Sequence, residues 1–279
     1  MLTVREKKTW EEILEWEHQL FSYDSNDFER TFEKWLEQSF SMLPEKIQQQ
    51  FFSLLDNWLF HLHSMIQGSQ LQIDAKERIL TAGRIFNSNI ETVEELTKLN
   101  IDQLQYIANQ QITRHRFYSF AQGGVSGTGG TLLLGADIPA MAIINLRVIQ
   151  LIGMTYGHEV NTPFEMMASL KVFHGATLPA RLKKEGWQVL KKDLEDADDF
   201  YFYNGDDEFM TVPWLEQPLK QLLKCIVIVL CRKRLFQGIP FISMAVGAGA
   251  NYQLTRNVTE FAHKYYQYRF LLEKHGGLS

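Results

Sequence analysis

The stretch Gly123-Gly-Val-Ser-Gly-Thr-Gly-Gly-Thr131 constrains the fold of this chain more than any other. Gly123, Gly127, Thr131 and Gly135 lie four residues apart, so a helix would place them on one face. A face of small residues lets a second helix approach to backbone contact. Glycine inside a helix costs roughly 0.8–1 kcal/mol relative to alanine. The stretch therefore predicts a close helix contact that offsets this cost.

A second glycine-rich segment offers a partner for that contact. In the segment 238–251, Ser243, Gly247 and Asn251 also recur every four residues. We expect an all-α protein, a multi-helix bundle with the two glycine-rich helical segments packed against each other at its centre.

Three catalytic or nucleotide-binding interpretations of the first stretch fail at specific positions. A phosphate-binding loop needs a lysine where Gly130 stands. A nucleophile elbow around Ser126 needs a glycine where Thr128 stands. No dinucleotide-binding register fits either. The glycines are thus better explained by packing than by chemistry.

The flanking sequence predicts helices and no strand alternation. Apolar residues at helical spacing predict elements over 28–43, 44–62, 74–86, 89–99, from residue 101 onward, 219–230 and 251–274. Asp137-Ile-Pro139 predicts a break, with Pro139 in the first turn of the next helix. Thr162-Pro-Phe-Glu165 has the form of a capping box, in which Glu165 would reach back to the cap.

Composition and charge describe one globular domain, residues 1–279, at the membrane face or in the cytosol. The chain is 45% hydrophobic, with two cysteines and a formal charge of -5, which gives no reason to expect disorder, a disulfide scaffold or nucleic-acid binding. No apolar leader begins it. Eight acidic residues gather in an expected loop at 193–208, and residues 1–115 hold 11 basic and 18 acidic residues. The remainder carries +10, from -5 + 8 + 7.

Two uncharged stretches raise the question of a membrane. Residues 117–136 and 235–255 are each long enough to span a bilayer, at about 1.5 Å per helical residue. They are rich in polar residues, however, and Arg147 would lie within a spanning hairpin. Helices buried in a soluble protein and a peripheral or partly inserted protein both stay open.

The sequence shows no catalytic or metal-binding constellation. The histidines have no zinc spacing, and the acidic loop lacks the glycine of a calcium loop. We expect no cofactor and no metal site. An enzyme acting on a lipid or peptide would need Asp137, Arg147 and Asn251 to converge in a pocket. A partner-binding module would instead expose an aromatic patch on the N-terminal helices.

Several of these residues resemble the motifs of the EcsC family. The resemblance lies in the glycines of 123–130, in Ala136-Asp-Ile-Pro139, Leu146-Arg147 and Tyr156-Gly157, and in the later Ile239-Pro240, Gly247-Ala248, Asn251 and Arg256. It covers roughly residues 75–272, and residues 1–74 and the acidic loop look variable. It implies a helical, membrane-associated or cytosolic accessory protein, because the family is named from an operon that encodes the Ecs ATP-binding-cassette exporter. It supplies no catalytic residue.

The functional expectation is a non-enzymatic accessory or regulatory protein, peripheral to the cytoplasmic membrane face. Its partners would be anionic lipid or a membrane protein such as an exporter, and not nucleic acid. The basic part would face the lipid. The motif and candidate ligand-binding residues are Gly123, Gly124, Gly127, Gly130, Asp137, Pro139, Arg147, Tyr156, Asn251 and Arg256.

Overall fold

The computed structural model describes residues 2–22, 69–128, 130–178, 182–195 and 240–276, with side chains except at 126–139, 163 and 240–246. These residues form α-helices, one 3-10 helix and no strand, so the predicted all-α fold is confirmed for them. The elements are α1 (Val4–Ser22), α4 (Gln70–Phe86), η1 (Glu94–Lys98), α5 (Ile101–Thr128), α6 (Gly130–Thr155), α7 (Pro163–Thr177), α8 (Lys183–Glu195) and α10 (Pro240–His275).

Side-chain caps fix where several helices begin. The Ser69 side chain accepts a hydrogen bond from the Gln72 amide at the start of α4. At the start of α5, the Asn100 side chain accepts from the Gln103 amide at 3.1 Å, and the Gln103 side chain accepts from the Asn100 amide at 3.0 Å. Each bond satisfies a backbone donor that a helix leaves unpaired in its first turn.

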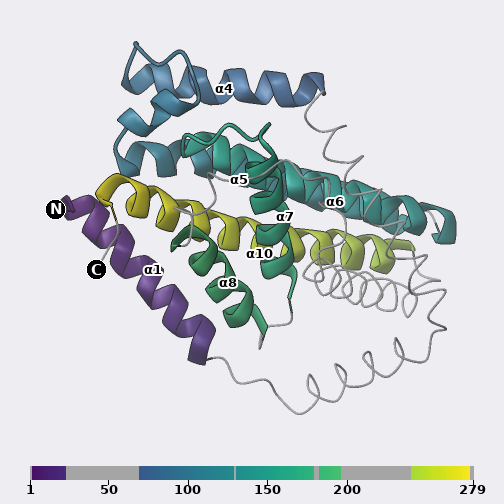
Figure 1. Cartoon of the computed structure of the whole chain (residues 1–279). Helices are drawn as coiled ribbons and strands as arrows, with labels where there is room; N and C mark the ends of the chain where they lie inside the picture. Colours follow the sequence, from purple (N-terminus) through teal and green to yellow (C-terminus); the bar gives the residue numbers. More distant parts are fainter. Residues whose placement is uncertain (1, 23–68, 129, 179–181, 196–239, 277–279) are drawn as a thin grey trace, which may run out of the picture.

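The helices form layers around α10 (Figure 1). α10 packs on α5, α6 and α7, and α1 lies against it on the other side together with α8. α4 covers the α5–α6 pair on the side away from α10. Chain segments far apart in sequence thus meet along one long helix, which carries the last part of the described chain.

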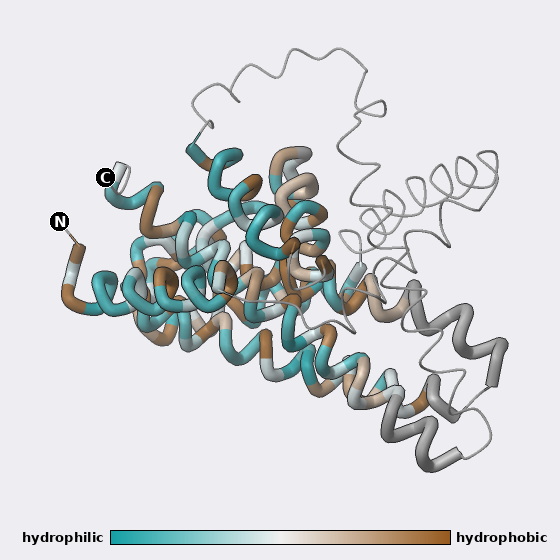
Figure 2. Tube along the Cα trace, turned by 90° about the horizontal axis from the view of Figure 1, so that it is seen from below, coloured by the Kyte–Doolittle hydropathy of each residue, from teal (hydrophilic) through white to brown (hydrophobic). Residues whose placement is uncertain are grey.

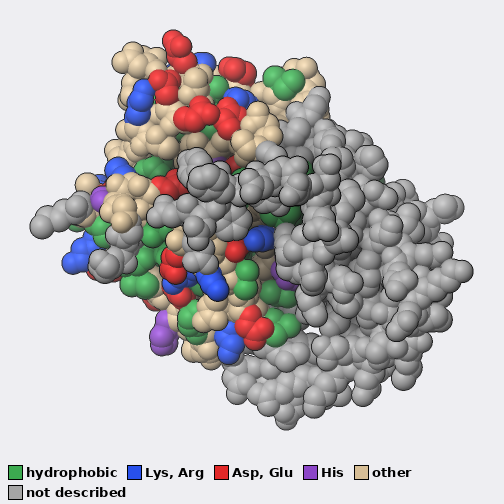
Figure 3. Space-filling view, viewed as in Figure 1, with side chains coloured by type: hydrophobic (Ala, Val, Ile, Leu, Met, Phe, Trp, Pro, Cys, Tyr) green, Lys and Arg blue, Asp and Glu red, His purple; other side chains and the backbone are tan. Residues whose placement is uncertain are grey.

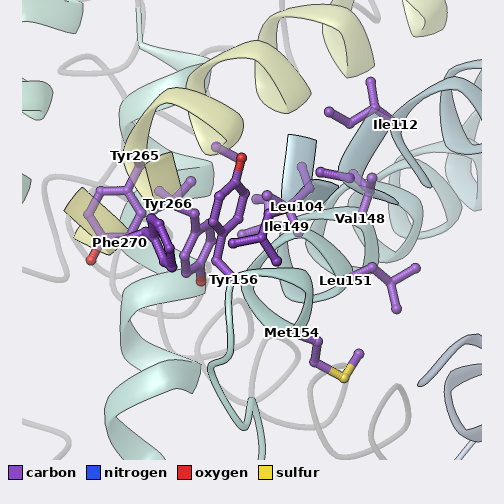
Figure 4. Packing of buried hydrophobic residues seen from close by; sticks show 14 of the residues in the cluster. Leu104, Ile112, Val148, Ile149, Leu151, Met154, Tyr156, Tyr265, Tyr266 and Phe270 are labelled. Carbon is purple, nitrogen blue, oxygen red and sulfur yellow. The ribbon is translucent and has the colours of Figure 1, made fainter. Parts of the chain in front are cut away.

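Every helix is amphipathic to some degree, with hydrophilic and hydrophobic residues intermingled along its length (Figure 2). The buried core joins α4, η1, α5, α6, α7, α8 and α10, and its centre is rich in aromatic rings. Figure 4 shows Tyr156 beside Tyr266 and Phe270, with Leu104 and Ile149 close by. The outer face over α4 and η1 carries charges of both signs (Figure 3). Burial of the apolar stripes drives this arrangement.

The first helix, α1, was not among the predicted elements. It begins with a capping box that the sequence Thr3-Val-Arg-Glu6 could have revealed: the Thr3 amide donates to the Glu6 carboxylate at 2.8 Å, and the Glu6 amide donates to the Thr3 hydroxyl at 3.2 Å. Glu6 also pairs with Lys274 of α10 at 2.8 Å. Trp16 stacks edge-on against Trp187 of α8, with ring centroids 4.9 Å apart.

Four predicted boundaries were wrong. The segment expected to be a helix over 89–99 is helical only at Glu94–Lys98, as a 3-10 helix. The expected acidic loop begins later, because Asp193 to Glu195 belong to α8. The last helix begins at Pro240 rather than at residue 251. α6 runs from Gly130 through Asp137 and Pro139 without the expected break.

The last correction has a physical reason. A proline inside a helix removes one hydrogen bond, here the bond to the carbonyl of residue 135, and the rest of the helix can continue. The chain instead divides between α5 and α6 near residue 129, so the stripe that includes Gly123, Gly127, Thr131 and Gly135 does not lie on one helix. The helices predicted over 28–43, 44–62 and 219–230, and the acidic residues 196–208, lie outside the described residues.

Candidate functional site

The two family motifs meet where α5 packs antiparallel to α10. A Cβ atom built on Gly123 would lie 2.4 Å from the Gly247 carbonyl oxygen and 2.9 Å from the Asn251 Cβ atom. No larger side chain fits there without movement of the α10 backbone. The predicted close contact is therefore present between these two glycines. Whether the remaining glycine-rich residues form the centre of the bundle stays a prediction, because their side chains lie outside the description.

Polar groups line the same seam. Ser119, fully buried on α5, donates to the Asn251 carbonyl at 2.8 Å and accepts from the Thr255 hydroxyl at 2.7 Å. The Asn251 side-chain amide donates to Gln122 at 2.7 Å. A buried hydroxyl or amide is tolerated when it is hydrogen-bonded, so these bonds fix how α5 and α10 align.

The seam continues to Arg116 of α5. Its Nε atom donates to the Thr259 hydroxyl at 2.9 Å, and its guanidinium also donates to the Arg256 carbonyl at 3.5 Å. The Arg256 side chain itself is exposed. This motif residue thus contributes its backbone to the seam and its charge to the surface.

Tyr156-Gly157 ends α6 in a Schellman motif. Gly157 has a φ of +93°, the left-handed conformation that glycine adopts without strain. Its amide bonds to the Met154 carbonyl at 3.0 Å, and the His158 amide bonds to the Gly153 carbonyl at 3.1 Å. These two bonds satisfy the last carbonyls of the helix.

Tyr156 is fully buried in the core. Its hydroxyl lies 2.9 Å from His263 Nε2 of α10, and its ring lies 6.0 Å from that of Phe270. Burial raises the pKa of the Tyr156 phenol above its ordinary value. A phenol held in this way joins α6 to α10 and has no access to a substrate.

Arg147 connects α6 to α4 instead. Its guanidinium donates to the Leu71 carbonyl in the first turn of α4. Its Nε atom is buried and has no hydrogen-bond partner in the described part of the chain. Burial, and then the nearby charge of Arg78, lower the pKa of the Arg147 guanidinium.

The residues of the enzyme alternative are not brought together as far as the structure describes them. Arg147 contacts α4, whereas Asn251 contacts Ser119 and Gln122 of α5. Gly124 lies half-buried on α5. The side chains at Gly127, Gly130, Asp137 and Pro139 lie outside the description. Among the residues described, no group of three or more His, Cys, Asp or Glu side chains is placed to hold a metal ion.

A buried ionic cluster escaped the sequence analysis. Arg269 Nη1 of α10 lies 2.6 Å from Glu165 Oε1 of α7, and Arg269 Nε lies 2.7 Å from Glu273 Oε1. The ring of His158 stacks on Tyr266 beside this pair, at 5.6 Å. Although burial acts to lower it, the Glu165 carboxylate raises the pKa of Arg269.

This cluster corrects the expected capping box at the start of α7. The Thr162 hydroxyl does accept from the Glu165 amide, at 3.2 Å. The Glu165 carboxylate, however, points to Arg269 instead of reaching back to the cap. A buried guanidinium without a carboxylate is more costly than an unpaired backbone donor at a helix end.

The second half of α5 turns polar side chains inward and aromatic side chains outward. Gln111, His115 and Ser119 are buried at four-residue spacing. Phe117, Tyr118 and Phe120 of α5 and Tyr252 of α10 are exposed, by 65%, 47%, 49% and 38%. We call these four residues the aromatic surface.

Nothing in the sequence distinguishes the two faces, because both carry residues that occur in cores. The rings of Phe120 and Tyr252 are nearly perpendicular, with centroids 6.5 Å apart, so the aromatic surface extends over α5 and α10. The exposed side chains of Arg114 and Arg256 belong to the same two helices. In the described ranges, no helix is both long enough and apolar enough to cross a membrane.

Comparison with known proteins agrees with the motifs. The model of the EcsC protein family matches residues 7–271, which begins well before the residue 75 expected from the motifs. "Uncharacterized protein YdbA" of Bacillus subtilis (strain 168) is 25% identical over 238 residues, covering 84% of this chain and 81% of that protein. "Protein EcsC" of the same organism is 26% identical over 192 residues, covering 68% and 73%. No solved structure matches the chain significantly. The protein belongs to the EcsC family.

Proposed function

We propose that this protein is a non-enzymatic accessory or regulatory protein that acts at the cytoplasmic face of a membrane. The observation that carries the proposal is the inverted second half of α5. Ser119 is fully buried, while its neighbours Tyr118 and Phe120 are exposed. Such an arrangement is favourable when the outer face meets an environment less polar than water.

A membrane interface provides that environment. Aromatic side chains concentrate at the level of lipid headgroups, where their rings meet both apolar and polar surroundings. Arginine side chains can keep their charge in the headgroup layer. Arg114 and Arg256 lie on the helices of the aromatic surface, within the part of the sequence that carries +10. Each basic residue near an anionic surface contributes about 1 kcal/mol to binding.

Association with an exporter or secretion system is the second part of the proposal. It rests on the family resemblance, and the same surface would bring the protein to the membrane that holds such a partner. The enzyme alternative is not proposed, because no observation on Arg147 or Asn251 favours a shared pocket.

Vesicle co-sedimentation tests the proposal. The purified full chain is mixed with vesicles of phosphatidylcholine, with and without 20% phosphatidylglycerol by design, at low and high salt. We expect binding to the anionic vesicles that weakens as salt rises. Failure to bind anionic vesicles at low salt would overturn the proposal.

Variants localise the contact. The double substitution F117S/F120S removes two rings of the aromatic surface, and we expect vesicle binding at least about tenfold weaker, since each ring buried in the interface contributes on the order of 1 kcal/mol or more. The matched control I85S/V189S removes two exposed apolar side chains on α4 and α8. Equal losses in the two double variants would show that the aromatic surface is not the contact.

A further inference from the structure

Positively charged side chains from three helices gather where α4 crosses the α5–α6 pair. They are Arg78 of α4, Arg114 of α5 and Arg147 of α6, with His115 of α5 buried beside them. We call this group the basic cluster. The three helices contact one another pairwise, so the cluster is formed by their junction.

The junction is held in place by hydrogen bonds that do not use the charges fully. The Arg147 guanidinium donates to the Leu71 carbonyl of α4. One turn further along α6, the Gln150 side chain accepts from the Gln72 side chain at 3.2 Å. These bonds fix α4 on α6 and hold Arg147 at the junction, while its Nε atom has no partner in the described part of the chain.

His115 points to the same conclusion. Its side chain is 2% exposed, its Nδ1 atom lies 2.9 Å from the Gln111 carbonyl, and its Nε2 atom has no partner among the described residues. Burial lowers the pKa of His115 to about 4; the Gln111 carbonyl opposes this, and the charges of Arg147, Arg114 and Arg78 lower the pKa further. An imidazole here faces only positive neighbours.

The cluster has little negative charge to balance it. No carboxylate oxygen in the described ranges lies within 4 Å of the guanidinium nitrogens of Arg78, Arg114 or Arg147. The charged groups that act on Arg147 are Arg78, Tyr118 and Asp74. Asp74 is already bound by the Gln70 side chain at 2.8 Å.

Other cations that are partly buried in this protein have a carboxylate partner. Lys76 lies 2.5 Å from Glu159, Lys171 lies 2.6 Å from Asp193, and Lys191 lies 3.0 Å from Glu17. The basic cluster departs from this pattern. Arginines gathered without carboxylates are typical of sites that take up the oxygens of an anionic group.

We propose that the basic cluster binds a phosphate group, carried either by the headgroup of an anionic phospholipid or by a free phosphate. Arg78 and Arg114 would contact the phosphate from solvent, and Arg147 and His115 would line the inner side. Binding of a headgroup rests on the proposed membrane function. Tyr118 connects the two surfaces, because its ring lies 5.6 Å from that of His115 and it belongs to the aromatic surface.

The test measures two ligands with the full chain. Calorimetric titration with inorganic phosphate, against chloride at the same ionic strength, reports a free phosphate. Co-sedimentation with phosphatidylcholine vesicles containing phosphatidylglycerol reports a headgroup. We expect the double substitution R78Q/R114Q, at two exposed positions, to weaken binding of phosphate and of anionic vesicles about tenfold or more.

The matched control is R5Q/R84Q, which removes the same charge from two exposed arginines that pair with Asp102 and Glu77. We expect it to leave phosphate binding within about twofold of wild type. F117S/F120S should weaken vesicle binding and leave phosphate binding intact. Thermal unfolding of each variant checks that the fold is retained.

The outcomes separate this inference from the proposed function. Binding of phosphate without binding of vesicles supports the cluster with a free phosphate as its ligand and overturns the membrane function. Binding of vesicles with no preference for phosphate over chloride, or equal effects of R78Q/R114Q and R5Q/R84Q, overturns the phosphate site and leaves the membrane function standing.

Discussion

Gly123 of α5 lies directly against the backbone of Gly247 of α10, so that a methyl group on Gly123 would come within 2.4 Å of the Gly247 carbonyl oxygen. The two residues are far apart in sequence, and each belongs to a different family motif. Their contact shows that the motifs are conformational requirements of the α5–α10 seam. Neighbouring Ser119 and Asn251 complete the seam by hydrogen bonds.

Substitution of Gly123 by alanine should therefore destabilise the protein. Forcing a methyl group into packed backbone costs about 1–3 kcal/mol, which exceeds the gain of up to about 1 kcal/mol in helix propensity. Gly249 supplies the control, because a Cβ atom there meets nothing within 4 Å. Urea unfolding should show a loss of stability for Gly123→Ala and a small gain for Gly249→Ala. A gain for both would contradict the close contact.

Removal of the Arg269 charge should be costly. Arg269→Met leaves the Glu165 carboxylate buried without its partner at 2.6 Å, and breaking such a pair costs about 3–5 kcal/mol. The double variant E165M/R269M should recover part of that loss, because no charge remains buried. A double-mutant cycle by urea unfolding measures the coupling. The exposed pair of Lys8 and Glu12 is the reference, with a change below about 1 kcal/mol for Lys8→Ala.

Tyr156→Phe tests whether this motif tyrosine is structural. The change leaves His263 without the hydroxyl at 2.9 Å, and a buried polar atom left unpaired costs about 1–3 kcal/mol. We expect lower stability with unchanged vesicle binding. Tyr106→Phe, at an exposed ring, should alter neither. Vesicle binding lost while stability is retained would instead assign Tyr156 to the contact surface.

The stability of the protein should depend on pH through His115. Its pKa is about 4 in the folded chain, below the ordinary value of 6.5, so the unfolded chain binds the proton more readily. The free energy of unfolding contributed by His115 is fully present above pH 6.5 and is lost as pH falls toward 4. Each pKa unit corresponds to about 1.4 kcal/mol, so the effect is on the order of 3 kcal/mol.

His115→Gln isolates this contribution, because other titrating groups are shared with the wild type. The wild type should lose more stability than the variant between pH 7 and 4, as measured by urea unfolding at each pH. A constant difference between the two proteins over this range would refute the assignment to His115.

The helices of the middle of the chain could be predicted from local signals. The apolar spacing after Asn100 and its reciprocal hydrogen bonds with Gln103 start α5 where expected. Thr162 likewise caps α7. Pro139 misled the prediction, because a proline suits a first helical turn and can also be accommodated further inside. The Thr3–Glu6 box was visible in the sequence and was not used.

The candidate site could be predicted only in part. Small residues at Gly123 and Gly247 indicated a close contact, and the contact exists, because it depends on local spacing and side-chain size alone. The basic cluster could not be foreseen, since Arg78, Arg114 and Arg147 come from three helices whose crossing depends on tertiary packing.

The sequence by itself determined that this protein is helical, where most described helices start, and that α5 and α10 each need small residues for close approach. These properties follow from interactions within about one or two helical turns. Only the tertiary structure decided that Ser119 faces inward and Phe117 outward, and that Glu165 binds Arg269 rather than its own cap. A side chain's burial and partner depend on which other helix lies beside it, and that choice minimises the free energy of the whole chain.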